Sequence, residues 1–159
     1  MEAVVALMDN RAEISNRLRN EFVFKPLGEF ASQKGLVFEV KKGNEGPAIL
    51  FKKQNWSHYI TVTRDDGRDS DWKNLYIGVS ESYKSAGEDR TLPRVQLSCF
   101  SGPDSANNEW WPYGSEWLPC KDWHSTSSYL PMQTGEVANW IISKVTQIIE
   151  EIESRDLPM

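Results

Sequence analysis

Thiol and imidazole groups are scarce in this chain of 159 residues, which has only two cysteines and two histidines. So few cysteines exclude a disulfide framework as the basis of the fold. A structural zinc site normally draws four ligands from closely spaced pairs. The available residues do not form two such pairs: His58, Cys99, Cys120 and His124. We therefore expect reduced, packed thiols, no metal site and no cofactor.

Signatures of common enzyme classes are also missing from the sequence. It has no Gly-x-Ser-x-Gly turn that would present a serine nucleophile. It has neither a Gly-x-x-x-x-Gly-Lys loop nor a Gly-x-Gly-x-x-Gly turn, which hold nucleotide phosphates. These absences count against serine hydrolases of that type and against enzymes that bind nucleotides through such loops. They do not exclude an unusual class of enzyme.

Long apolar runs are absent as well. No stretch approaches the roughly 18 apolar residues that a membrane-spanning helix requires. Near the start of the chain, Glu2, Asp9 and Arg11 surround a short apolar run, unlike the basic start and small-residue cleavage site of a secretory signal. We expect a cytoplasmic protein without a membrane partner.

Positive charge is in deficit, because 18 Lys and Arg residues face 23 Asp and Glu residues and give a formal net charge of −5. Binding along a nucleic acid depends on clustered Lys and Arg side chains that release counterions from the phosphates. The charge therefore disfavours extended contact with nucleic acid. It leaves an unknown protein or a small ligand as the expected partner.

The chain does contain a clear order of periodic segments. Apolar residues at helical spacing predict an amphipathic helix from Val4 to about Phe22, which should end before Pro26, with a short second helix reaching Ala31. Five runs rich in β-branched and aromatic residues predict successive antiparallel strands: LVFEVKK, AILFKK, HYITVTR, NLYIGVSE and RVQLSCF. We expect turns in KKGNEGP and at Asp66-Gly67, and a polar loop over residues 81–92.

The last part of the chain has the strongest helical pattern, with Thr134 as the predicted N-cap. Its apolar residues recur every three or four positions: Val137, Ile141, Val145, Ile148 and Ile152. A short strand from Tyr129 to Met132 could precede this helix. The whole pattern predicts a single α+β domain over residues 1–159. We expect an antiparallel sheet of about five or six strands, with the N- and C-terminal helices packed on one face.

Aromatic residues are abundant, and four of the seven tryptophans fall between Asn107 and His124. This segment supplies the predicted binding residues: Trp110, Trp111, Tyr113, Trp117 and Trp123. Exposed rings there could stack on a ligand or hold a partner's side chain. Rings set among prolines and glycine could equally be buried against the sheet and anchor an irregular connection. Trp110 and Trp111 should point to opposite sides if they extend a strand.

One fragment could carry catalysis. In FEVKK, Glu39 and Lys41 are two residues apart, which places a carboxylate and an ammonium on the same face of a strand. Such a pair can help to hold a divalent cation and position a water, as in the Glu-x-Lys half of a PD-(D/E)XK nuclease site. That site also needs an acidic residue from a preceding strand, and Asp9 and Glu29 are poor substitutes for it. Alternating Glu and Lys residues are also common on the solvated face of a strand.

Four segments together resemble a known arrangement: LRNEFVFKPLGEFA, NLYIGVSE, EWWPYGSEWL and GEVANWIISKVTQIIEEIE. In this order they resemble the region that follows the catalytic domain in some bacterial and phage proteins of the PD-(D/E)XK nuclease superfamily. The resemblance implies an accessory module without the nuclease core. Because the catalytic acids of the family would lie upstream of such a module, it assigns no catalytic residue here.

The sequence leads to three functional hypotheses. The first is a non-catalytic binding or accessory domain of a cytoplasmic bacterial or phage protein that uses the aromatic surface. The second is a metal-dependent nuclease-like enzyme that uses Glu39 and Lys41. The third is a self-associating structural protein, a homodimer joined through the wide apolar arcs of its terminal helices.

Overall fold

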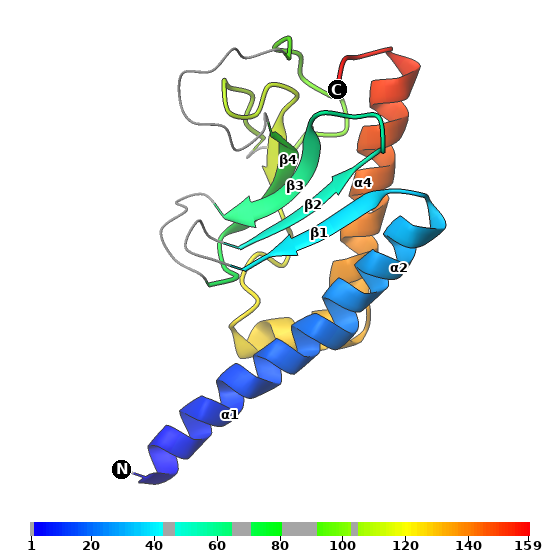
Figure 1. Cartoon of the computed structure of the whole chain (residues 1–159). Coiled ribbons are helices and arrows are strands. Elements are labelled where there is room, and N and C mark those ends of the chain that lie inside the picture. Colours follow the sequence, from blue (N-terminus) through cyan, green and yellow to red (C-terminus); the bar gives the residue numbers. More distant parts are fainter. Residues whose placement is uncertain (1, 43–46, 65–70, 81–91, 103–104) are drawn as a thin grey trace.

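The computed structural model describes residues 2–42, 47–64, 71–80, 92–102 and 105–159. Figure 1 shows an antiparallel sheet with helices from both ends of the chain, which confirms the predicted α+β class. The strands are β1 (Val37–Lys41), β2 (Ala48–Lys52), β3 (Tyr59–Arg64), β4 (Leu75–Ser80) and β5 (Ser115–Trp117). The helical segments are α1 (Glu2–Arg19), η1 (Asn20–Phe24), α2 (Lys25–Gln33), η2 (Thr126–Ser128), α3 (Tyr129–Gln133) and α4 (Glu136–Ser154).

The sheet is a meander in which each strand pairs with the next, in the order β1-β2-β3-β4-β5. Because side chains alternate along a strand, the sheet has two distinct faces. One face carries the core residues Ile49, Phe51, Ile60, Val62, Leu75, Ile77 and Val79, all buried. The other face, called the second face below, carries Glu39, Lys41, Thr61, Tyr76, Gly78 and Trp117.

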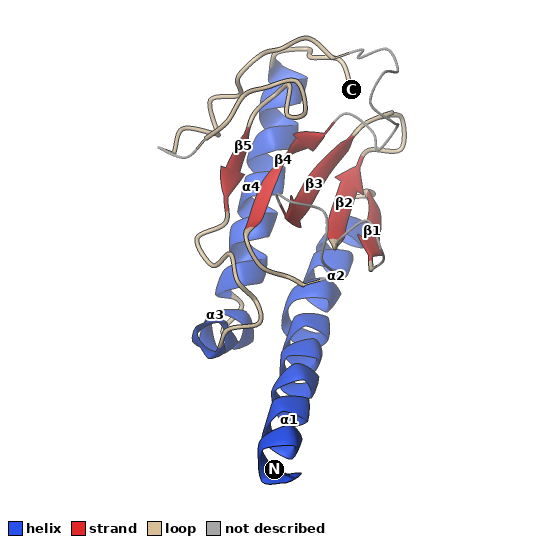
Figure 2. Ribbon diagram, turned by 90° about the vertical axis from the view of Figure 1, so that its left-hand side faces the viewer, coloured by secondary structure: helices blue, strands red, loops and turns tan. Residues whose placement is uncertain are grey.

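Helices α2 and α4 cover the core face of the sheet, as expected. All five apolar residues that predicted the last helix are buried along α4. Figure 2 shows α4 running behind the strands, while α1 extends away from the sheet. At its C-terminal end α1 lies against α3, where the Ser15 and Tyr129 hydroxyls are 3.2 Å apart. The sheet contact at this end of the chain therefore comes from α2 and not from α1.

The helix break expected before Pro26 is wrong. A proline inside a regular α-helix lacks an N–H and clashes with the carbonyl four residues earlier. The chain instead makes a π-helical turn over Asn20–Phe24, and the Lys25 N–H donates to the Asn20 carbonyl five residues back. Pro26 follows this wider turn within the first turn of α2, so the helical path continues without interruption.

Two further expectations about local structure are wrong. The run RVQLSCF does not form a strand, and β5 comes from the tryptophan segment instead. The N–H groups of Val95 and Leu97 donate to the Pro112 and Tyr113 carbonyls, so this run lies along the tryptophan segment without entering the sheet. Residues Tyr129–Met132 are helical.

The N-cap prediction for α4 is also corrected. Thr134 follows α3, and its hydroxyl donates to the Leu130 carbonyl at 2.9 Å. The residue before α4 is Gly135, whose φ of 82° lies in the left-handed region that favours glycine. This glycine separates α4 from α3, the segment for which the sequence had suggested a short strand.

The turns expected in KKGNEGP and at Asp66-Gly67, and nearly all of the polar loop over 81–92, lie outside the described residues. Within the described part of the chain, no helix combines the length and apolar character needed to cross a membrane.

Candidate functional site

The tryptophan segment reaches the second face of the sheet through a strand pairing and through the packing of one ring on a glycine. Strand β5 pairs with β4, with Trp117 opposite Tyr76 and Ser115 opposite Gly78. The ring of Trp111 lies over Gly78, where a Cβ would come within 2.5 Å of it. These contacts place the Tyr76, Trp111 and Trp117 rings on the second face.

Two of the predicted binding residues are structural, because their side chains are fully buried. The Trp123 ring stacks on Trp72 with centroids 5.4 Å apart, and its Nε1–H donates to the Cys120 carbonyl. The Tyr113 hydroxyl donates to the Pro158 carbonyl at 2.5 Å. Neither ring can offer a face to an external ligand, so the anchoring interpretation holds for this pair.

The other three predicted residues reach the surface to different extents. Trp110 is 56% exposed. Trp111 is partly buried. The backbone N–H groups of Trp110 and Trp111 both donate to Asn108 Oδ1, at 2.9 and 3.1 Å, and this forms a tight turn. This turn lets Trp110 point outward while Trp111 packs on the sheet. Trp117 is partly buried at the edge of the sheet.

A small hollow on the second face is lined by the rings of Tyr76, Trp111 and Trp117. Its volume is about 130 Å³. The Tyr76 ring is 5.1 Å from the Trp111 ring and 5.5 Å from the Trp117 ring between centroids, and both pairs of planes meet at 78°. Ala106, Asn108 and Ser115 complete most of the wall. We call this feature the aromatic hollow, and its defining residues are Tyr76, Trp111 and Trp117.

Two charged residues, Glu116 and Lys121, lie at or near the aromatic hollow. Glu116 also lines it, but its carboxylate forms an ion pair with Lys144 of α4, and both side chains are largely buried. Lys121 is not among the lining residues, yet its Nζ lies 4.5 Å from the centroid of the Trp117 ring. An ammonium at this distance is within the range of a cation–π attraction.

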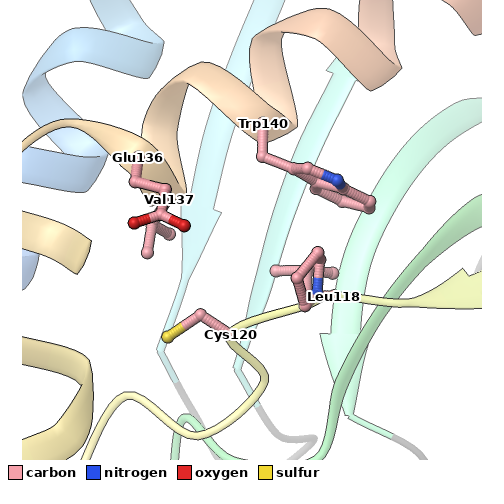
Figure 3. A pocket seen from close by; sticks show the side chains of 6 residues that line it. Leu118, Cys120, Glu136, Val137 and Trp140 are labelled. Atoms are coloured by element: carbon pink, nitrogen blue, oxygen red, sulfur yellow. The ribbon is translucent and has the colours of Figure 1, made fainter.

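A second, smaller hollow of about 70 Å³ lies between α4 and the chain that follows β5. Figure 3 shows Trp140 and Leu118 at one side of it and Glu136 and Cys120 at the other. Burial raises the pKa of the Cys120 thiol, and the Glu136 and Asp122 carboxylates raise it further. The thiol therefore stays protonated at neutral pH and is a weak nucleophile there.

Glu39 and Lys41 share the second face of the edge strand β1, as the sequence predicted, and both are exposed. They are opposite Leu50 and Ala48 on β2. Within the part of the chain that the structure describes, no three Asp, Glu, His or Cys side chains gather where they could hold a metal ion. The nuclease hypothesis stays a prediction.

The homodimer hypothesis depended on the apolar arcs of the terminal helices. On α4, the additional apolar residues Trp140, Ile142 and Ile149 pack against the core of the same chain. On α1, Ile14 is 43% exposed. Self-association also stays a prediction.

The sequence analysis did not predict which residues the tryptophan segment lies against. Tyr76 and Gly78 could have been found, because they alternate with the buried residues Leu75, Ile77 and Val79 and so belong to the opposite face. No sequence pattern indicated the role of Asn108, because that role depends on the local turn. No protein-family model, no curated protein and no solved structure matches the chain.

Proposed function

We propose that this chain is a non-catalytic ligand-binding domain and that the aromatic hollow is its binding site. The observation that carries the proposal is the placement of Tyr76, Trp111 and Trp117 around a hollow of about 130 Å³ on the second face of the sheet. Small-molecule sites are typically concave, lined by apolar and aromatic side chains, and equipped with a few polar groups. The aromatic hollow is concave and combines three aromatic side chains with the polar residues Asn108, Ser115 and Glu116.

Rigidity of the support is a second argument for this site. Tyr76 and Trp117 are paired across β4 and β5, and Trp111 lies directly on Gly78. Side chains held by a sheet lose little further conformational entropy when a ligand binds. The rings are therefore already arranged for a ligand.

Size limits what the aromatic hollow can hold. Pockets for whole drug-sized ligands usually have roughly 300–1,000 Å³. At about 130 Å³ the aromatic hollow suits a single group of a ligand. The rest of the ligand would extend toward the exposed Trp110 or into solvent. A role as an accessory domain in a cytoplasmic bacterial or phage protein is a wider proposal, which rests on the resemblance described above.

The proposal can be tested by nuclear magnetic resonance on protein labelled at the tryptophan indoles. Single Trp→Phe variants assign the Nε1–H signals. The full chain is then titrated with small sets of neutral sugars, organic cations, organic anions and short peptides. We expect at least one class to shift the Trp111 and Trp117 signals saturably while the buried Trp72 and Trp123 signals stay in place. If no class shifts the signals of Trp111 and Trp117, the proposed site is wrong.

A further inference from the structure

We infer that the aromatic hollow binds a trimethylammonium group or an organic cation of that size. This inference rests on the function proposed above and names the chemical class of the ligand. Its basis is the combination of three π systems with described wall residues that include no basic side chain for an anion and no unpaired acid for a small cation.

The wall of the aromatic hollow does not favour an anion. Its described residues are aromatic rings, Ala106, Asn108, Ser115 and Glu116, and none of these described residues is an Arg, Lys or His. A phosphate or carboxylate would therefore meet no positive side chain in the wall. The chain as a whole carries a formal net charge of −5, which attracts cations and repels anions at long range.

The wall suits an organic cation better than a metal ion. Calcium and magnesium need several oxygen ligands, usually including carboxylates. Among the described residues that line the hollow, only Glu116 is acidic, and its carboxylate is already paired with Lys144, which also donates to the Cys99 carbonyl at 2.7 Å. A bulky organic cation does not need a carboxylate, because the faces of Trp and Tyr rings attract it directly.

The arrangement of the three rings also favours a cation. A cation within about 6 Å of a ring centroid is attracted by the ring, and Trp gives the strongest attraction. Tyr76 lies 5.1 and 5.5 Å from the two tryptophan rings, with its plane close to perpendicular to each. Tyr76 therefore contacts both tryptophans edge to face, so the π systems adjoin one another in the wall, and methyl groups on a single nitrogen in the hollow could touch more than one of them.

Lys121 provides an internal example of the same interaction. Its ammonium lies 4.5 Å from the Trp117 centroid, although Lys121 does not line the aromatic hollow. A cation from the chain itself is thus already held at one of the three rings. A ligand cation in the hollow would be attracted to Tyr76, Trp111 and Trp117 by the same interaction.

The test compares choline with 3,3-dimethylbutan-1-ol, which has the same shape but a neutral carbon in place of the nitrogen. Both are titrated into the full chain, and the assigned indole signals and the heat of binding are measured. We expect choline to shift the Trp111 and Trp117 signals saturably and to bind at least tenfold more tightly than the neutral alcohol. Equal affinities, or no binding of choline, would overturn the inference.

Failure of this inference can be told apart from failure of the proposed function. If a neutral sugar or the neutral alcohol shifts the Trp111 and Trp117 signals and choline does not, the binding site stands and the cation is wrong. If no probe of any class shifts them, both are wrong. A short peptide with one trimethyllysine serves as a third probe. Tighter binding of this peptide than of choline would indicate that the trimethylammonium group is carried by a protein, and the reverse would indicate a free small molecule.

Variants locate the binding. Trp117→Leu and Trp111→Leu should each weaken choline binding at least tenfold, because each removes one π face from the aromatic hollow. Trp110→Leu is the matched control, since Trp110 is exposed and does not line the hollow. Circular dichroism checks that each variant folds. Equal losses in all three variants would count against the assignment, and the comparison of choline with its neutral isostere remains decisive even if a variant does not fold.

Discussion

At the scale of single residues, Glu151 shows how one carboxylate fixes a segment far away in the sequence. It accepts from the Ser98 N–H at 2.6 Å, from the Cys99 N–H at 3.1 Å and from the Arg155 guanidinium at 3.0 Å. Burial opposes the ionisation of this group, but the hydrogen bonds outweigh it and the pKa of Glu151 is lowered. The charged form is therefore the one that holds residues 98–99 against α4.

We expect Glu151→Gln to lower the free energy of unfolding by about 1.5–3 kcal/mol, the usual range for hydrogen bonds to a charged group. A glutamine offers only one acceptor oxygen and no charge to the two backbone donors. Urea denaturation at pH 7 measures the change. Glu150→Gln is the control, because Glu150 is the exposed neighbour and its change should stay within about 0.5 kcal/mol. Equal stability of the two variants would contradict this role.

At the scale of elements, the union of β5 with the sheet depends on glycine. A Cβ on Gly78 would lie 2.5 Å from the Trp111 ring, 2.7 Å from the Gly114 carbonyl oxygen and 2.8 Å from the Ser115 Cβ. Gly114 itself has a φ of 101°, which only glycine adopts without strain. The two glycines therefore let the tryptophan segment lie flat on β4 and shape the aromatic hollow.

Gly78→Ala should lower the free energy of unfolding by about 1–3 kcal/mol, because an added methyl group forces the packed backbone of β5 away. It should also shift the indole signal of Trp111. The matched control is Gly102→Ala, where the nearest atom to an added Cβ is the end of the Glu116 side chain at 3.4 Å. Thermal unfolding and the indole spectrum are the two measurements. An unchanged Trp111 signal would show that β5 does not rest on Gly78.

Much of the element pattern could be predicted from the sequence, because β1 to β4 and α4 are specified by local periodicity. The RVQLSCF run has the same local pattern of strand-forming residues. Its N–H groups, however, donate to the Glu151 carboxylate and to the Pro112 and Tyr113 carbonyls instead of to a strand of the sheet. Those partners are 16 and 17 residues away for the two carbonyls and 52 and 53 residues away for Glu151, so no local window reveals them. The aromatic hollow was predictable in part: its tryptophans stood out, whereas the contribution of Tyr76 depends on the β4–β5 register.

At the scale of the whole molecule, His124 joins parts of the chain that are far apart. Its Nε2 accepts from the Trp72 N–H at 2.8 Å, which only an imidazole with an unprotonated Nε2 can do. Partial burial lowers the pKa of His124, and the positive charge of Arg19 on the N-terminal helical segment lowers it further, while Asp71 opposes the shift. The folded state therefore favours neutral His124.

This linkage predicts a pH dependence of stability. Because the pKa of His124 is lower in the folded state than its ordinary value of about 6.5, the unfolded chain binds the proton more tightly. The contribution of His124 to stability is fully present above about pH 6.5 and declines as the pH falls toward the lowered pKa. We expect the starting protein to unfold at a lower temperature at pH 5.5 than at pH 7.5.

His124→Gln isolates this effect, because glutamine can still accept from the Trp72 N–H but does not titrate. The difference in melting temperature between pH 7.5 and pH 5.5 should be smaller in this variant than in the starting protein. Carboxylates that titrate in the same range act equally in both proteins, so the comparison removes their contribution. An unchanged difference would mean that His124 does not link protonation to folding, and that the contacts between Trp72 and the segment around His124 survive protonation of the ring.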